Sequence, residues 1–205
     1  SACLVGSEMC IRDSFYIDVG AHHPKRFSNT FLFYRRGWRG INIDAMPGSM
    51  KAFERVRPRD INIEAAVAGD NATKTYYMLS DSGLNSFDYD LSSKRAQNTS
   101  YRIVARRELR TCTLANLLDT YLPVGQQITF LSVDVEGMDL EVLHSNDWSR
   151  FRPRYALAEC LGLSSLEDTI HSETCRFLRD CQYQPVAKTL RTVLFQECSG
   201  IGKQS

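Results

Sequence analysis

The stretch ITFLSVDVEG, residues 128–137, is the most apolar strand-like segment of the chain, and it ends in two carboxylates and a glycine. A continuous apolar run is typical of a strand that is buried on both faces at the centre of a parallel sheet. Leu140, Val142 and Leu143 follow at helical spacing. The segment therefore predicts a strand–turn–helix unit with Asp134 and Glu136 at the carboxyl end of the strand.

Short apolar runs alternate with amphipathic stretches along the rest of the chain. The other strands expected in the parallel sheet are residues 15–20, 40–44, 61–67 and 155–159. Further helices are expected over residues 28–36, 47–56, 113–121 and 166–181. A peripheral β segment (73–79), a polar loop region with a short helix (84–99) and a closing antiparallel pair (184–188 with 192–197) complete the pattern. This predicts a Rossmann-like, doubly wound α/β fold with a mostly parallel seven-stranded sheet and an antiparallel C-terminal strand pair.

Composition narrows the class of protein. The chain has 205 residues, of which 43% are hydrophobic and 24% charged, which is enough for one domain with a substantial core. Its 25 Lys+Arg against 24 Asp+Glu argue against a broad surface for nucleic acid or anionic lipid. No apolar run reaches the length of a membrane span. The seven cysteines contain no CxxC pair and no metal-ligand spacing, so no metal-binding residue is assigned and a reducing cytoplasm is expected.

The first residues form a separate segment. Cys3–Ser14, CLVGSEMCIRDS, resembles the in-frame translation of a common sequencing adapter. A secretory signal is the competing interpretation, but the stretch lacks a basic start and a long apolar centre. We therefore expect residues 1–14 to be a non-native scar and residues 15–205 to be a single domain.

The first strand ends in Asp18 and Gly20, at the edge of the sheet where ligands of open α/β folds bind. Gly20 has no Cβ, so the backbone there can approach a ligand closely. A dinucleotide-binding turn would need GxGxxG, whereas this turn has one glycine, an acid before it and Pro24 after it. The turn therefore suits a ligand with an ammonium group better than a pyrophosphate. An ordinary strand-to-helix turn is the structural alternative.

Other carboxylates end the neighbouring strands. Asp44 follows the second strand, where it could accept both hydroxyls of a ribose, or could serve as a solvated turn residue or helix cap before Pro47. Asp134 and Glu136 are two residues apart, so they can face one cleft and raise each other's pKa, as suits a general base or a pair of metal ligands. Alternatively, Glu136 caps the following helix and Asp134 orders the turn.

Two histidines follow the first turn. His22 or His23 could take a proton from a hydroxyl near neutral pH. Adjacent side chains point apart, so we expect at most one of them to face the cleft. A structural role for both is equally compatible with the sequence. The arginines at positions 102, 106, 107 and 110 are expected to form a solvated face rather than a phosphate site.

Three segments resemble the FkbM-type methyltransferases, a branch of the class I enzymes that use S-adenosylmethionine. They are FYIDVGAHHPKRFSNTFLFYRRGWRGINIDAMPGSMKAF (15–53), INIEAAVAG (61–69) and FLSVDVEGMDLEVLHSNDW (130–148). The resemblance runs from residue 15 to about residue 197, nearly all of the chain after the scar. It implies the class I methyltransferase fold and S-adenosylmethionine as the cofactor.

The resemblance also implies roles for individual residues. Those expected to hold the methionine part of the cofactor are Asp18, Gly20, Ala21 and His22, with Ser28 and Asn29 meeting its carboxylate through amides at a helix N-terminus. Those expected to hold the adenosine part are Asp44, Ala45, Met46, Ala66 and Val67. Asp134 and Glu136 are expected to face the sulfonium and the methyl acceptor.

The expected reaction is methyl transfer by in-line displacement to a hydroxyl of a sugar or secondary metabolite, that is, a small molecule or a glycan. The candidate bases are Asp134, Glu136, His22 and His23. The chain has DVEG where methyltransferases acting on nucleic-acid bases carry an aromatic-containing motif, so no nucleic-acid partner is expected. A nicotinamide oxidoreductase would need the missing glycines. A non-catalytic or truncated cofactor-binding domain is the alternative, and the sequence leaves a divalent metal and the oligomeric state open.

Overall fold

A seven-stranded sheet forms the centre of the computed structural model, which describes residues 14–160 and 165–198. Apart from Ser14, the expected N-terminal scar lies outside the described residues. The strands, in their order across the sheet, are β3 (Ile61–Glu64), β2 (Arg39–Asp44), β1 (Phe15–Val19), β7 (Phe130–Val133), β8 (Tyr155–Glu159), β10 (Thr192–Glu197) and β9 (Tyr183–Lys188). All neighbours pair in parallel except β10, which is antiparallel to both β8 and β9. The predicted fold class is confirmed.

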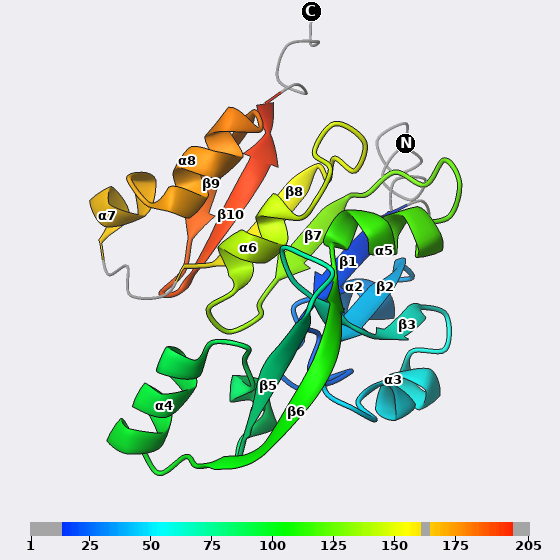
Figure 1. The fold of residues 1–205 in the computed structure, drawn as a ribbon. Helices are drawn as coiled ribbons and strands as arrows, with labels where there is room; N and C mark the ends of the chain where they lie inside the picture. The colour runs from blue at the N-terminus through cyan, green and yellow to red at the C-terminus, as the bar shows by residue number, and fades with distance from the viewer. Residues whose placement is uncertain (1–13, 161–164, 199–205) are drawn as a thin grey trace, which may run out of the picture.

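Helices cover both faces of this sheet. Leucines of α5 (Leu114–Tyr121), apolar residues of α6 (Asp139–His144) and of α8 (Glu173–Asp180) join one core cluster with Phe15, Ile17 and Val19 of β1. Tyr16 and Asp18 alternate with these residues and therefore face the opposite side. Figure 1 shows α5, α6 and α8 in front of the sheet and α2 (Phe31–Arg35) behind it. Every residue of β1 is buried, which accounts for its apolar composition apart from Asp18.

The helices lie where the sequence predicts them, but their lengths differ from the predicted lengths. Thr113 caps α5 as expected, because its hydroxyl accepts a hydrogen bond from the Asn116 amide at 3.2 Å. The helix expected over 28–36 is confined to α2, and the one over 47–56 to α3 (Met50–Val56). The single helix expected over 166–181 was wrong. It is divided into α7 (Leu166–Ile170) and α8, since Ser172 accepts from the Cys175 amide and begins a new helix.

A second sheet departs from the sequence-based expectation. It has the order β4 (Ala66–Val67), β6 (Ile103–Cys112) and β5 (Thr73–Leu79). The single strand expected over 61–67 was wrong, because the Ala65 amide donates to the Asp44 carbonyl while the Ala68 amide donates to the Cys112 carbonyl. The chain thus changes sheets at Ala65. Strand β6 was not expected at all. Its alternation is broken by three consecutive exposed residues, 106–108.

The segment from 73 to 112 forms an arm that comprises β5, the 3-10 helix η1 (Ser82–Leu84), α4 (Tyr89–Asn98) and β6. Figure 1 shows the β5–β6 hairpin and α4 projecting together from one side of the seven-stranded sheet. The region expected to be a loop with a short helix therefore contains a helix of 10 residues, capped by Asp88, whose side chain accepts from the Leu91 amide. The arginines of the expected solvated face are exposed along and beside β6.

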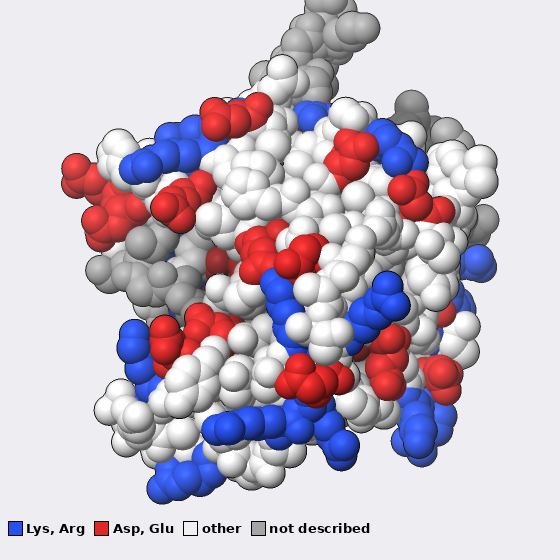
Figure 2. All heavy atoms as spheres, viewed as in Figure 1, with Lys and Arg blue, Asp and Glu red and all other residues white. Residues whose placement is uncertain are grey.

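Charged side chains are mixed on the surface. On the face drawn in Figure 2, Lys and Arg lie among Asp and Glu over both the sheet and the arm. Within the part of the chain that the structure describes, no helix combines the length and apolar character needed to cross a bilayer.

Candidate functional site

The candidate site lies where the strand order reverses. The chain proceeds from β1 to β2 on one side and from β7 to β8 on the other, so the carboxyl ends of β1 and β7 border a crevice. At this point Gly20 has a φ of +82°, and a Cβ on it would lie 1.8 Å from the Asp134 carbonyl oxygen. Glycine is therefore required for the close approach of the two turns to each other, in addition to any approach of a ligand.

Two adjoining pockets open at this crevice. The first, the β2 pocket, contains about 500 Å³ of space free of protein atoms and extends over the end of β2. The second, the turn pocket, contains about 800 Å³ and lies over the turn between β1 and α2. The residues that line both pockets are Gly20, His22, Gly83, Asp134 and Glu136.

Asp44 forms the polar floor of the β2 pocket. Only 8% of its surface is exposed, and its two oxygens accept hydrogen bonds at 2.8 Å from the backbone amides of His22 and Met46. Asp44 is therefore not a solvated turn residue, and the residue preceding α3 is Ser49. Burial raises the pKa of Asp44, while the bonds from Met46 and His22 lower it. Each carboxylate oxygen still has lone-pair capacity for a further donor.

The arm supplies the opposite wall of the β2 pocket. Tyr76 and the segment 82–87, apart from Leu84, line it, and the Ser82 hydroxyl lies 3.1 Å from Nε2 of His22. These residues were not among those predicted from the sequence. The Ser, Gly and Asn residues at 80–86 do indicate a loop, but the local pattern does not show that this loop folds back over the carboxyl ends of β1 and β2.

Asp18 lies at the base of the turn pocket and is 2% exposed. The Thr30 hydroxyl donates to its Oδ2 at 2.6 Å. Burial raises the pKa of Asp18, whereas hydrogen bonds from Thr30 and Ser132 and the charge of Arg57 lower it. The carboxylate is thus buried but well supplied with donors.

Ser28 and Asn29 also line the turn pocket, but not as expected. The hydroxyl of Ser28 accepts from the amides of Thr30 and Phe31, at 3.3 and 3.1 Å. Because α2 begins at Phe31, the helix-terminal amides that were expected to meet a ligand carboxylate already have a side-chain acceptor. Among the described residues that line the two pockets, Arg26 is the only Lys or Arg.

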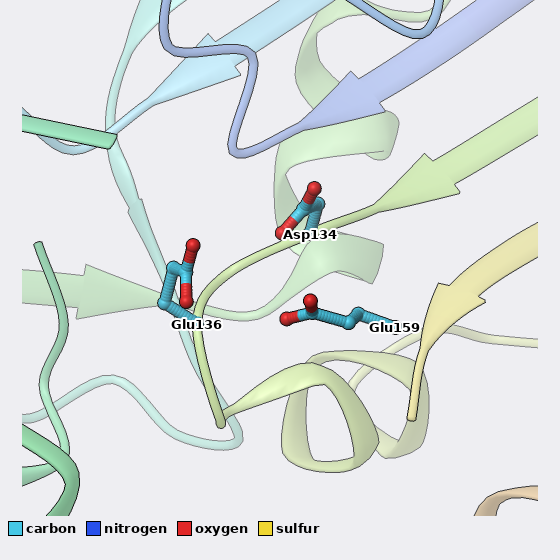
Figure 3. A group of neighbouring side chains, drawn as sticks. All are labelled: Asp134, Glu136 and Glu159. Atoms are coloured by element: carbon cyan, nitrogen blue, oxygen red, sulfur yellow. The ribbon is translucent and has the colours of Figure 1, made fainter. Parts of the chain in front are cut away.

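Three carboxylates meet between the ends of β7 and β8. Each of Asp134, Glu136 and Glu159 offers an oxygen, and these oxygens lie within 4.8 Å of one another (Figure 3). Burial, followed by the charges of Glu136 and Asp18, raises the pKa of Asp134 to about 6. Burial, followed by Asp134 and Glu136, raises the pKa of Glu159 to about 8. Such a cluster can hold a cation, and oxygen ligands of this kind suit Mg²⁺ or Ca²⁺.

Asp139, rather than Asp134 or Glu136, orders the turn after β7. Its carboxylate accepts from the amides of Val135 and Gly137, at 3.4 and 3.3 Å. Glu136 instead forms an ion pair with Arg95 of α4, and its carbonyl accepts from the Ser86 hydroxyl. The alternative in which Glu136 caps the helix and Asp134 orders the turn was therefore wrong. Neither carboxylate is used to begin α6.

Backbone strain is concentrated around the pockets. Among the described residues other than glycine, four have a positive φ, and three of them line a pocket: His22 (51°), Phe27 (56°) and Glu136 (55°). Each such residue costs about 1 kcal/mol or more, and such residues cluster at functional sites. The strain is a second reason to treat this crevice as the candidate site.

The structure brings most of the expected residues together. Ala21 lines the turn pocket, and Ala45 and Val67 line the β2 pocket. His22 lines both, whereas Nδ1 of His23 accepts from the amides of Lys25 and Arg26 and His23 lines neither. Met46 and Ala66 also lie outside the described lining of both pockets.

A doubly wound sheet with pockets at its switch point defines a Rossmann-like α/β domain. The sequence model of the Methyltransferase FkbM domain matches residues 18–185, and the chain belongs to this family. The fold is similar to the crystal structure of methyltransferase FkbM from Methylobacillus flagellatus KT, with a TM-score of 0.53, 12% identity and coverage of 90% of this chain. The likeness covers 44% of that chain, so this chain spans less than half of its length. None of the curated proteins compared matches the chain.

Proposed function

We propose that the chain transfers a methyl group from S-adenosylmethionine to a hydroxyl of a small molecule or glycan, such as a sugar or secondary metabolite. Membership of the FkbM methyltransferase family supports methyl transfer. The observation that carries the choice of cofactor is the charge of the pockets. The β2 pocket has no Lys or Arg among its described lining residues, while Asp44, Asp134 and Glu136 contribute to it.

This charge distribution fits the cofactor. S-adenosylmethionine carries positive charge on its sulfonium and on its ammonium group, and the acids of the two pockets complement both. The pyrophosphate of a nicotinamide cofactor would meet the same acids, with Arg26 as the single guanidinium. The lining therefore disfavours an oxidoreductase that uses a dinucleotide.

We assign the parts of the cofactor to the pockets as follows. The free lone pairs of Asp44 would accept the ribose hydroxyls, with Ala45 and Val67 beside the adenine. Asp18 would bind the ammonium group in the turn pocket. Asp134, which lines both pockets, would lie at the junction, near the sulfonium and the acceptor.

The bound cofactor would supply an electrophilic methyl group, and the protein would orient the acceptor and take its proton. Asp134 is the base that we favour, because its raised pKa of about 6 leaves it mostly ionised but more basic than an ordinary aspartate at neutral pH. The carboxylate of Glu136 is already engaged by Arg95 of α4. His22 remains a candidate, while His23 lines neither pocket.

A cytoplasmic location is part of the proposal. The cysteines at 112, 160, 175, 181 and 198 are all free thiols, as expected in a reducing compartment. The alternative function, a cofactor-binding domain without turnover, makes the same use of Asp44 and differs only in the absence of an acceptor.

Titration calorimetry of the full chain with S-adenosylmethionine and S-adenosylhomocysteine tests the proposal. We expect micromolar binding that is lost in Asp44→Ala and kept in Glu54→Ala, a matched control at an exposed acid of α3. Failure of the folded wild-type chain to bind either ligand would refute the choice of cofactor. Transfer of a labelled methyl group to a panel of hydroxyl acceptors, with Mg²⁺ or with a chelator, then tests the reaction. Binding without transfer to any of them would favour the non-catalytic alternative.

A further inference from the structure

A buried arginine lies behind the turn pocket. Arg57 follows α3, has no exposed surface, and packs against the rings of Tyr16, Tyr34 and Phe53. Its Nε donates to the Asp60 carboxylate at 2.9 Å, and both side chains of this ion pair are fully buried. A buried charge needs such a partner. The pair with Asp60 uses only one edge of the guanidinium.

The remaining donors of Arg57 point toward the turn pocket. One terminal nitrogen donates to the Tyr16 hydroxyl at 2.6 Å and to the Thr30 hydroxyl at 2.8 Å, and the other donates to the Ser28 hydroxyl at 3.2 Å. Thr30 immediately precedes α2, where a threonine hydroxyl usually accepts from a helix amide. Its hydroxyl makes no such bond. The Thr30 side chain is therefore committed to the polar cluster rather than to the helix.

The donor and acceptor capacities of these side chains determine which group donates in each hydrogen bond of the cluster. A guanidinium can only donate, so the oxygen of Thr30 accepts from Arg57 and its own proton must go elsewhere. The nearest acceptor is Oδ2 of Asp18, 2.6 Å away; the Ser28 hydroxyl is 3.4 Å away and already accepts from Arg57 and from two backbone amides. The order Arg57 to Thr30 to Asp18 thus requires that Oδ2 of Asp18 accepts, as it does in an ionised carboxylate.

A second hydroxyl, that of Ser132, also accepts a hydrogen bond from a nitrogen and directs its own proton at Asp18. Nδ2 of Asn29 donates to the Ser132 hydroxyl at 3.1 Å. Ser132 lies beside Asp18 in the register of β1 and β7, and it in turn gives a hydrogen bond to Asp18 that lowers the pKa of that carboxyl. Two hydroxyls, each oriented by a nitrogen donor, therefore direct their protons at one buried carboxylate. This arrangement opposes the protonation that burial alone would favour.

We propose that Thr30, oriented by Arg57, is a positioning residue. It holds the carboxylate of Asp18 in the orientation that binds the ammonium group of the amino-acid part of the ligand. The inference rests on the proposed function, since the methionine part of S-adenosylmethionine carries that ammonium. A cluster that only stabilised the fold would not discriminate between ligands with and without an amino-acid part. This difference makes the role testable by binding.

The experiment compares two ligands on variants of the full chain. S-adenosylhomocysteine carries the ammonium group, whereas 5′-methylthioadenosine has the same adenosine thioether without the amino-acid part. Thr30→Val removes the hydroxyl at nearly constant volume, and Thr30→Ser restores it. Thr169→Val is the matched control, because Thr169 is also buried but its hydroxyl donates to the Ser165 carbonyl in α7. Calorimetry gives both affinities for each variant.

We expect Thr30→Val to bind S-adenosylhomocysteine about tenfold more weakly, as for the loss of a hydrogen bond to a charged group, and to bind 5′-methylthioadenosine as the wild type does. Thr30→Ser should restore most of the affinity. Arg57→Lys should show the same selective loss, since a lysine can pair with Asp60 but cannot also orient Thr30 and Ser28. An equal loss for both ligands, or no loss for either, would overturn the inference while leaving the proposed function in place. A wild-type chain that binds neither ligand would refute the proposed function itself.

Discussion

Replacing Glu159 by glutamine should make the protein more stable at pH 8 and leave it nearly unchanged at pH 5. Burial, with Asp134 and Glu136 close by, raises the pKa of Glu159 from 4.5 to about 8. Between these values the folded protein binds a proton that the unfolded chain releases. The free energy of unfolding therefore falls as the pH rises through this window. Glutamine cannot ionise, so it removes this contribution.

The size of this change in stability follows from the pKa shift of Glu159 and from its burial. A shift of this extent would correspond to about 5 kcal/mol in a fully buried site. Glu159 is only partly buried, and solvent screening leaves about 2 kcal/mol. The wild-type chain should thus lose about 2 kcal/mol of unfolding free energy between pH 5 and pH 8 through this group, and Glu159→Gln should retain it.

Urea unfolding followed by circular dichroism at several pH values between 5 and 8 measures the difference. Glu54→Gln, at an exposed position of α3, is the control and should follow the wild type. If Glu159→Gln loses stability with pH as steeply as the wild type, or is less stable at pH 8, the three carboxylates do not share a site as Figure 3 shows them.

Three further predictions test other parts of the site. Gly20→Ala should destabilise the fold by about 3 kcal/mol or more, measured by chemical unfolding, because the new Cβ would meet the Asp134 carbonyl in a left-handed backbone. Thr113→Ala should cost about 1 kcal/mol of stability in the same measurement through loss of the cap of α5, with ligand affinity unchanged. Arg95→Gln should raise the pKa of Asp134 above about 6, because the charge of Arg95 lowers that pKa in the wild type. A carbon NMR titration of the Asp134 carboxyl measures the change. An unchanged pKa would show that Arg95, which is paired with Glu136, does not act on Asp134.

The strands whose boundaries were predicted correctly are those in which the burial of alternate residues produces a regular pattern in the sequence. Residues 155–159 and 192–197 have the boundaries that the sequence predicts. Strand β6 was missed because its exposed residues interrupt the alternation. The change of sheets at Ala65 was missed because residues 61–67 contain no glycine or proline that would mark a break, and one continuous segment can be shared between two sheets.

Only the part of the candidate site that is formed by the strand ends was predictable from the sequence. Asp18 and Asp44 lie at the carboxyl ends of β1 and β2, and Asp134 comes directly after β7, so their meeting at one edge of the sheet follows from the parallel topology. The wall formed by the arm depends on how a polar loop folds back, which no local pattern encodes. Arg57 lies in the sequence VRPRD, which is typical of a solvated surface, and its complete burial depends on Asp60, Tyr16 and Thr30 together.

The β2 pocket is enclosed by two different sheets, with Asp44 on one and Tyr76 on the other. A ligand held between them binds only while the arm is docked. Local opening of the arm and release of the ligand are therefore linked equilibria, and each factor of ten in ligand concentration above the dissociation constant adds about 1.4 kcal/mol to the free energy of undocking. The stability of the docked arm thus rises with the logarithm of the ligand concentration, while the far edge of the large sheet, β9 and β10, does not line this pocket.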